Sequence, residues 1–205
     1  MAEPPAVAVL AAGRGSRFGG DKLDAPCAGK PVGEWALDAI AAAGWPPGLL
    51  VLPPRNVAFA QSAQGWQQRI NFLAGQGLGT SLAVAAQWAL EAQAEGLLVL
   101  LADMPLVDAS YLRRLAAAPP PAATAHPGGR AGVPALLSRT LLGKAARLTG
   151  DEGAARLLAG AQGLTLLEPP EGMLLDIDRP EDRVLAEERL LARRHPHPSR
   201  KDPEA

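Results

Sequence analysis

Residues Ala6 to Ala12 form an unbroken apolar run close to the start of the chain. A strand with one face in solvent alternates apolar and polar residues, whereas this run is apolar at every position. Such uniform patterning is typical of a parallel strand that helices cover on both faces of its sheet. The run therefore predicts a buried central strand and places the chain in the α/β class.

Helix-like and strand-like segments alternate through the first half of the chain. Apolar residues at helical spacing, further apolar runs and turn residues mark their limits. The sequence predicts helices at 32–43, 56–68 and 81–94, and strands at 48–53, 69–73 and 96–102. This alternation favours a three-layer α/β/α sandwich with a mostly parallel sheet.

The second half of the chain is less regular. It predicts a helix at 109–117, a Pro-, Gly- and Ala-rich connection at 119–132, a short strand at 134–137, helices at 138–148 and 152–161, a strand at 164–168 and a last helix at 180–194. The length suits one well-buried domain, so we expect a single domain over 1–194. The polar, proline-rich residues 195–205 predict a disordered tail.

Charge and cysteine content exclude several classes of function. The chain has 205 residues and a net charge of −1, so no overall field would hold it to nucleic acid or to an anionic membrane. Its one cysteine, Cys27, excludes an internal disulfide and a multi-cysteine metal site. The N-terminus shows no export signal and no apolar stretch approaches membrane-spanning length, so we expect a cytoplasmic protein.

Glycines and cations crowd the loop that follows the first strand. Residues 13–22 hold four glycines together with Arg14, Arg17 and Lys22. Glycine lets backbone N–H groups approach an anion closely, and the cations supply charge. The loop is neither a G-x-G-x-x-G fingerprint, because Phe18 takes the third glycine position, nor a P-loop, because no G-K-[ST] follows. An ordinary glycine-rich turn is the alternative to a polyphosphate site.

A second polar segment lies at the predicted start of the helix at 81–94. Asn71 is followed by the glycine-rich stretch 75–81, which ends in Thr80 and Ser81. We expect Thr80 or Ser81 to cap the helix. The free N–H groups of a helix start favour an anion or a polar base edge, so this segment predicts part of a ligand site.

Two aspartates follow apolar segments and predict a metal site. Asp103 ends a buried strand, where a carboxylate is costly unless a cation or hydrogen bonds compensate it. Asp178, in the stretch Asp-Ile-Asp that starts at Asp176, is the second candidate, although it could instead cap the helix near Pro180. Asp103 and Asp178 together are suited to a Mg²⁺ that also binds substrate phosphates. Such a site suits phosphoryl or nucleotidyl transfer.

These segments resemble the signatures of the MobA-like nucleotidyltransferases. The stretch from Leu10 to Lys22 is similar to the pattern L-A-[AG]-G-x-[SG]-x-R-[MF]-G-x-x-K. The segments 77–82, 101–107, 150–156 and 176–182 follow in an order that resembles the molybdenum cofactor cytidylyltransferase branch. The resemblance spans about residues 6 to 188 and implies a Rossmann-like fold, CTP and Mg²⁺.

The resemblance also implies roles for individual residues. Arg17, Lys22 and Asp103 would be catalytic, and Asp103 and Asp178 would bind Mg²⁺. The implied nucleotide-binding residues are Leu10, Ala11, Ala12, Gly13, Gly15, Ser16, Arg17, Lys22, Asn71, Gly79, Ser81 and Asp103. Among them Ala11, Ala12 and Gly13 would approach the base, and Gly15, Ser16 and Arg17 the phosphates.

The implied reaction transfers CMP from CTP to the phosphate of molybdopterin cofactor and releases pyrophosphate. Ala12 favours CTP, because the guanylyl branch resembles L-A-G-G where this chain has L-A-A-G. The acceptor would meet the segments 125–131 and 132–137, where this chain departs from its relatives, and His126 could contact it. GTP, a sugar phosphate or another small phosphorylated acceptor, and a non-catalytic carrier are the alternatives. A transient contact with a molybdoenzyme or its chaperone is also implied.

Overall fold

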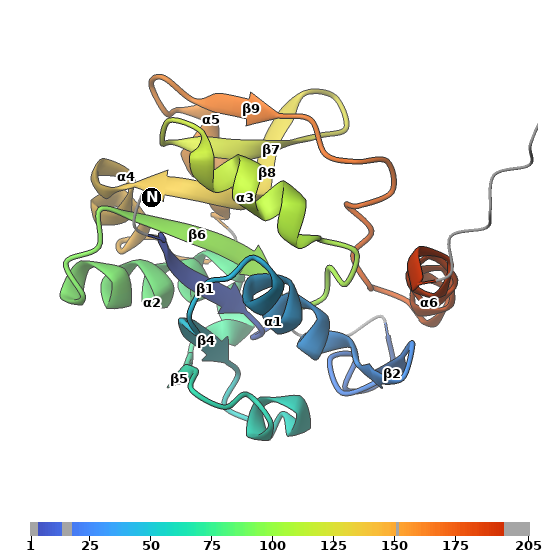
Figure 1. The fold of residues 1–205 in the computed structure, drawn as a ribbon. Coiled ribbons are helices and arrows are strands. Elements are labelled where there is room, and N and C mark those ends of the chain that lie inside the picture. The colour runs from blue at the N-terminus through green and yellow to red at the C-terminus, as the bar shows by residue number, and fades with distance from the viewer. Residues whose placement is uncertain (1–3, 14–17, 151, 195–205) are drawn as a thin grey trace, which may run out of the picture.

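A seven-stranded sheet forms the centre of the protein in a computed structural model that describes residues 4–13, 18–150 and 152–194 (Figure 1). In spatial order its strands are β5 (Gln67–Ile70), β4 (Leu49–Leu52), β1 (Ala6–Leu10), β6 (Gly96–Leu101), β8 (Arg130–Ser138), β7 (Ala122–His126) and β9 (Thr165–Leu167). A small separate ribbon pairs β2 (Pro26–Cys27) with β3 (Lys30–Pro31).

The sheet is parallel apart from β8, which runs antiparallel to both β6 and β7. Val9 of β1 is in register with Leu50 of β4 and Leu100 of β6. The carboxyl ends of β1, β4, β5 and β6 therefore meet at one edge, where ligands collect in open α/β sheets. The predicted buried central strand is confirmed as β1.

Helices cover both faces of the sheet, so the expected three-layer architecture is confirmed. Helices α1 (Val32–Ala42) and α3 (Ala109–Ala117) lie on one face; α2 (Leu78–Glu91), α4 (Arg139–Ala145) and α5 (Ala154–Ala159) lie on the other (Figure 1). Short 3-10 turns η1 (Ala58–Gln61) and η2 (Ala74–Gln76) precede β5 and α2. The last helix, α6 (Pro180–Arg194), packs beside β2. No helix in the described ranges has the length and apolarity to cross a bilayer.

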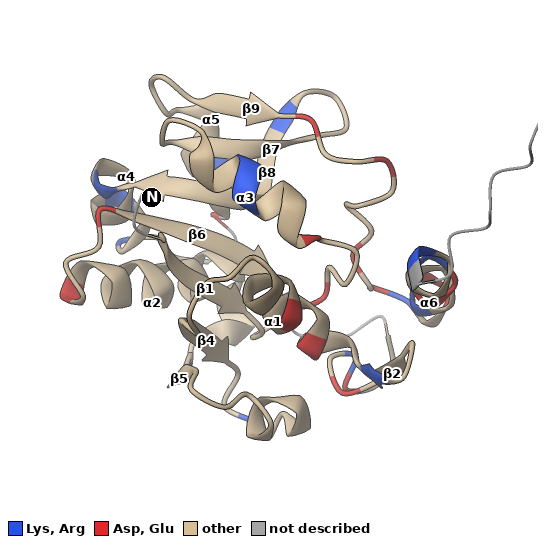
Figure 2. Ribbon diagram, in the orientation of Figure 1, with Lys and Arg blue, Asp and Glu red and all other residues tan. Residues whose placement is uncertain are grey.

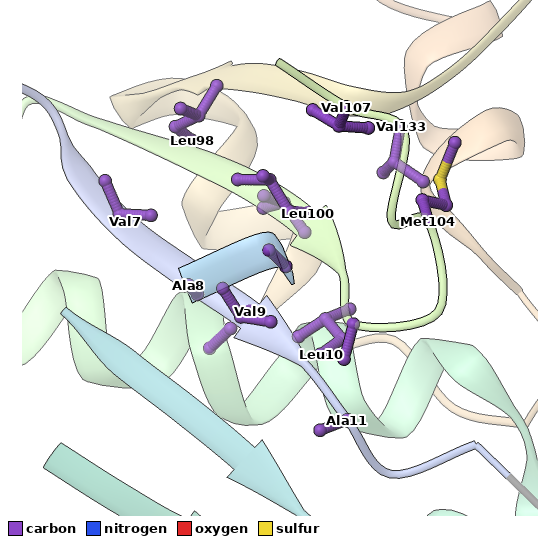
Figure 3. Close-up of a cluster of buried hydrophobic side chains, with 14 of the residues drawn as sticks. Val7, Ala8, Val9, Leu10, Ala11, Leu98, Leu100, Met104, Val107 and Val133 are labelled. Carbon is purple, nitrogen blue, oxygen red and sulfur yellow. The ribbon is translucent and has the colours of Figure 1, made fainter. Parts of the chain in front are cut away.

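The core sits on the central strands, which carry no charge (Figure 2). Side chains of β1 and β6 lie side by side there, as Figure 3 shows for Val7, Val9, Leu98 and Leu100. All four are at most 2% exposed. Burying each such side chain contributes about 1.5–3 kcal/mol, so the sheet edge that carries the polar residues rests on a rigid base.

The helix predicted at 56–68 is wrong. Only the 3-10 turn η1 forms there, and β5 begins at Gln67, two residues before the predicted strand. Gly65 adopts a positive φ of +78° that ends any helical path. Phe59 and Ala60 are buried in this short turn. The apolar spacing that predicted a helix therefore reflects burial of side chains in the turn and not a long helix.

The connection at 119–132 contains a strand that the sequence did not predict. Residues 122–126 form β7, and β8 begins at Arg130 rather than at Pro134. Thr124 is fully buried, and its hydroxyl donates to the Pro134 carbonyl at 2.7 Å. Pairing with β8 and β9 makes this Ala-rich segment a strand, because tertiary contacts override weak intrinsic propensity. The predicted helices at 138–148 and 152–161 form as the shorter α4 and α5.

Candidate functional site

Lys22 joins two distant aspartates at the carboxyl edge of the sheet. Its Nζ donates to Asp103 Oδ2 at 2.6 Å and to Asp178 Oδ1 at 3.1 Å. The Lys22 side chain is 6% exposed, Asp103 17% and Asp178 46%. Asp103 lies two residues after the end of β6, and Asp178 precedes α6. A charge that is this buried requires a partner, and the structure provides two.

A backbone hydrogen bond sets Asp178 beside Asp103. The Ile177 N–H donates to the Asp103 carbonyl at 2.9 Å, and the Ile177 side chain is fully buried. Successive residues of an extended segment point to opposite sides, so Asp178 faces away from Ile177. Its carboxylate binds Lys22, whereas Asp182 accepts the N–H groups of Asp178 and Arg179 before α6. Asp182, rather than Asp178, therefore accepts the N–H groups before α6, and the Asp178 carboxylate contacts Lys22.

Burial and charge act against each other in this cluster. Burial alone would lower the pKa of Lys22, but attraction and hydrogen bonds to Asp103 and Asp178 outweigh it, so the pKa is raised. Burial raises the pKa of Asp103, and Asp176 adds to this, although Lys22 opposes both. Oδ1 of Asp103 is buried and makes no hydrogen bond with the described residues. Among the described residues, the Lys22 ammonium is thus the cation in contact with these two carboxylates.

The donor set fits a hard divalent cation that retains water or substrate ligands. Asp103 and Asp178 supply two carboxylates, and Oδ1 of Asp103 is a buried oxygen without a partner. No group of three or more His, Cys, Asp or Glu within the described ranges is placed to hold a metal. Mg²⁺ is commonly held by one or two carboxylates together with phosphate oxygens and water. A pair of aspartates is therefore a sufficient protein contribution.

A cavity of about 370 Å³ lies where β1 ends. Its lining is Ala12, Gly13, Ala74, Gly75, Gln76, Gly77, Leu78 and Ser81. The structure thus brings the end of the first strand together with the segment before α2, as the sequence predicts for a nucleotide site. The predicted residues Gly15, Ser16 and Arg17, like Arg14, lie outside the described residues.

Side-chain hydrogen bonds of Asn71 hold the segment at the start of α2, which lines this cavity. The Nδ2 of Asn71 donates to Thr80 Oγ1 at 2.8 Å and Ser81 Oγ at 2.9 Å, and its Oδ1 accepts the Leu73 N–H at 2.9 Å. Asn71, Thr80 and Ser81 are all buried. Asn71 and Ser81 therefore meet as predicted, with the Asn71 amide shaping the loop and Ser81 lining the cavity.

The predicted capping of α2 by Thr80 or Ser81 is wrong. The helix begins at Leu78, and its N-cap is Gly77, which has a φ of 134° and offers no side chain. Thr80 instead donates to the Gly77 carbonyl at 2.8 Å from inside the first turn. Glycine allows this backbone conformation. The helix therefore begins three residues before the predicted start at position 81.

Other predicted residues shape the site through backbone packing. The Leu10 carbonyl accepts the Ala102 N–H at 3.0 Å, and the Ala11 N–H donates to the Val51 carbonyl at 2.9 Å. The Gly79 N–H donates to the Gly150 carbonyl at 3.1 Å, and a Cβ there would lie 2.5 Å from the Glu152 carbonyl oxygen. Among the described residues that line the 370 Å³ cavity, Gly79 does not appear. Gly79 therefore lies where α2 contacts the backbone of Gly150 and Glu152.

A larger cavity of about 550 Å³ lies between the β7–β8 turn, the segment after β9 and α6. It is lined by residues 125–129 and 168–172 together with Leu174, Leu175, Leu185 and Arg189. Figure 2 shows acidic positions along the segment that joins β9 to α6. His126 is only partly buried, and its Nε2 donates to the Val133 carbonyl at 2.8 Å. Of the two segments predicted to meet the acceptor, residues 125–129 of the first line this cavity, whereas residues 132–137 are not among its lining residues.

Sequence reasoning missed the residues that hold the segment after Lys22. Glu187 Oε1 accepts the Ala28 N–H at 2.8 Å, and Arg183 donates to the Pro26 carbonyl at 2.8 Å. These two hydrogen bonds hold α6 against the β2–β3 ribbon. The carboxylate of Asp24 accepts the N–H groups at the start of η1. The i,i+4 spacing of Arg183 and Glu187 was the available signal, but it does not reveal the target of the pair.

Comparison with known proteins agrees with this geometry. Residues 7–166 match the family model described as the MobA-like NTP transferase domain. The purine catabolism protein PucB of Bacillus subtilis is 30% identical over 186 residues, covering 84% of this chain and 91% of PucB. Rv0371c of Mycobacterium tuberculosis superposes with a TM-score of 0.75 at 28% identity, covering 92% of this chain and all of that one.

A further solved structure shows the same fold. It is a nucleotidyl transferase from Methanothermobacter, with a TM-score of 0.77 at 24% identity over 94% of this chain and the whole of that one. At this identity the likeness concerns the fold alone. The family match covers most of the chain, and PucB aligns over nearly the full length of both proteins, so the protein belongs to the MobA-like NTP transferase family.

Proposed function

We propose that the protein transfers CMP from CTP to the phosphate of molybdopterin cofactor and releases pyrophosphate, using Mg²⁺ held by Asp103 and Asp178. The observation that carries this proposal is the contact of Lys22 with both carboxylates at the sheet edge that also carries the 370 Å³ cavity. Opposed charges at a sheet edge suit a reaction in which positioning and neutralisation of phosphate charge supply most of the catalysis.

The chemistry is an in-line substitution at phosphorus. An oxygen of the acceptor phosphate forms a bond to the α-phosphorus of CTP, while the bond from that phosphorus to the bridging oxygen breaks. Pyrophosphate leaves with the bonding electron pair. The ammonium of Lys22 would stabilise charge that grows on the α-phosphate, and Mg²⁺ would supply further neutralisation. Manganese in a crystal structure of Rv0371c supports a divalent ion in this role.

Ala12 supports CTP as the nucleotide. It lines the 370 Å³ cavity and is 4% exposed, so its methyl group takes up space on the wall that the base would meet. The L-A-A-G sequence around it follows the cytidylyl pattern. A Cβ added to Gly13 would meet no atom of the described residues within 4 Å, which is consistent with close approach of a ligand to the backbone.

The 550 Å³ cavity supports a place for the acceptor separate from the 370 Å³ cavity. Its lining includes Leu175, the residue before the stretch Asp176 to Asp178. An acceptor held there would direct its phosphate towards the cluster of Lys22 and the two aspartates. A volume of this size is within the range of small-molecule sites in proteins.

The test is pyrophosphate release by the purified protein with Mg²⁺ and CTP, GTP, ATP or UTP, each with and without molybdopterin cofactor. We expect release with CTP only when the cofactor is present. Asp103→Asn is the matched inactive control, since it removes one charge at nearly constant volume. Preference for GTP would assign a guanylyltransferase. Binding of nucleotide without release from any of the four would refute the proposed reaction.

A further inference from the structure

Lys22 contacts one oxygen of each of the two candidate metal ligands. Its Nζ lies 2.6 Å from Asp103 Oδ2 and 3.1 Å from Asp178 Oδ1, and the second oxygen of Asp103, Oδ1, is buried. Mg²⁺ binds carboxylate oxygens at about 2.0–2.1 Å. An ammonium in direct contact with an oxygen would then lie next to a dication bound to that same oxygen. Repulsion between two cations on the same oxygens opposes the joint arrangement, so an ion that binds Oδ2 of Asp103 and Oδ1 of Asp178 has to displace Lys22.

The charges of the cluster fit a dication better than they fit Lys22. One ammonium faces two carboxylates, and Asp103 Oδ1 is buried without a hydrogen-bond partner among the described residues. A dication would match the formal charge of the pair. Two carboxylates at this depth would be costly without a counter-charge. The ammonium of Lys22 supplies that charge.

We propose that Lys22 is a built-in counter-ion of the free protein, which a divalent metal displaces from Asp103 and Asp178 as the ammonium moves to the phosphates of the nucleotide. This inference rests on the proposed function for the metal-binding role of the two aspartates. The ammonium keeps its proton throughout and changes only its partner.

The consequence is coupled binding of metal and nucleotide. In the free protein the metal must displace Lys22 without giving it a new partner, so metal affinity is low. A triphosphate supplies the new partner and thereby raises metal affinity. Because such coupling is reciprocal, the metal raises nucleotide affinity by the same factor.

The experiment measures Mn²⁺ affinity by electron paramagnetic resonance in the absence of nucleotide. Lys22→Met retains much of the length of the side chain and removes the competing charge, and we expect it to bind Mn²⁺ at least about tenfold more tightly than the wild type. Lys22→Arg, which keeps the charge, should stay weak. Lys144→Met is the matched control, since it removes the same charge from an exposed position on α4 and should leave the affinity unchanged.

A second titration adds α,β-methylene-CTP, which cannot release pyrophosphate. The analogue should raise the Mn²⁺ affinity of the wild type by a larger factor than that of Lys22→Met. Equal Mn²⁺ affinity of Lys22→Met and Lys144→Met without nucleotide would overturn the proposal. If Lys22→Met is unfolded without metal, recovery of its circular dichroism on adding Mn²⁺ supports the proposal, and failure to recover overturns it. The first titration uses neither CTP nor acceptor, so its result is independent of pyrophosphate release.

Discussion

The backbone N–H of Ile177 donates to the carbonyl of Asp103 over 2.9 Å and so links the end of β6 to the segment before α6. This bond places Asp178 beside Asp103, and Lys22 contacts both carboxylates. The arrangement joins three parts of the chain at one sheet edge. The expected consequences concern catalysis, nucleotide choice, packing and thiol reactivity.

Replacing Asp103 by Asn should lower the rate of pyrophosphate release at least about 10²-fold, since the carboxylate is the more buried of the two candidate metal ligands. The melting temperature should change little, because Lys22 keeps its contact with Asp178. Asp176→Asn removes the same charge from an exposed neighbouring position and serves as the control. A wild-type rate in Asp103→Asn would exclude Asp103 from metal binding.

Replacing Lys22 by Ala should also slow pyrophosphate release, by about 10²-fold or more, because a buried ammonium directed at phosphate would be lost. Saturating CTP should not restore the rate if the loss lies in the transition state. Steady-state kinetics over a range of CTP concentrations separates these effects. An unchanged kcat would remove Lys22 from the catalytic residues.

Replacing Ala12 by Gly should shift the nucleotide preference towards GTP. The methyl group of Ala12 lines the cavity, and its removal makes room for the larger purine. We expect the ratio of kcat/KM for CTP to that for GTP to fall about tenfold, the scale of one methyl-sized group in a pocket. Competition assays with both nucleotides measure the ratio, and the same ratio in both proteins would contradict the role of Ala12.

Replacing Gly79 by Ala should lower the free energy of unfolding by about 1–3 kcal/mol, because overpacked sites force the backbone apart. The new Cβ would lie 2.5 Å from the Glu152 carbonyl oxygen and 2.9 Å from that of Gly150. Gly143→Ala is the control, since nothing lies within 4 Å of a Cβ there and Ala favours the helix. Urea unfolding compares the two variants. Equal stability would show that the backbone at Gly150 and Glu152 shifts without cost.

The thiol of Cys27 should react slowly with Ellman's reagent in the native protein. Cys27 is fully buried, and burial raises the pKa of its thiol, with Glu187 adding to the effect while Arg183 opposes it. The thiol of Cys27 thus keeps its proton to higher pH in the native state than in the unfolded chain. Below the ordinary thiol pKa it favours the folded state, and this contribution is lost as the pH rises through the raised pKa. Rapid native labelling at neutral pH would contradict this assignment.

How far the sequence predicts the site depends on the range of the contacts. The apolar runs of β1 and β6 are local patterns, and each predicted its strand, with Asp103 lying two residues after β6. The glycine-rich turn after β1 includes residues 14–17, which lie outside the described residues, so its role stays a prediction. The polar segment after Asn71 predicted a wall of the cavity. The helix at 56–68 and the missing strand β7 were errors, since propensity and spacing do not reveal that Gly65 turns the chain or that Thr124 is enclosed by β8.

By itself the sequence determined the α/β class, the order of most elements and the residues that carry charge to the sheet edge, because these follow from periodicity and from the cost of burying charge. The tertiary structure alone decided that Lys22 pairs with Asp178, 156 positions away, and that Asp182 rather than Asp178 accepts the N–H groups before α6. It also decided that Gly79 packs against the carbonyls of Gly150 and Glu152. These contacts arise only when distant segments are brought together, and their energies depend on distances that the order of residues does not contain.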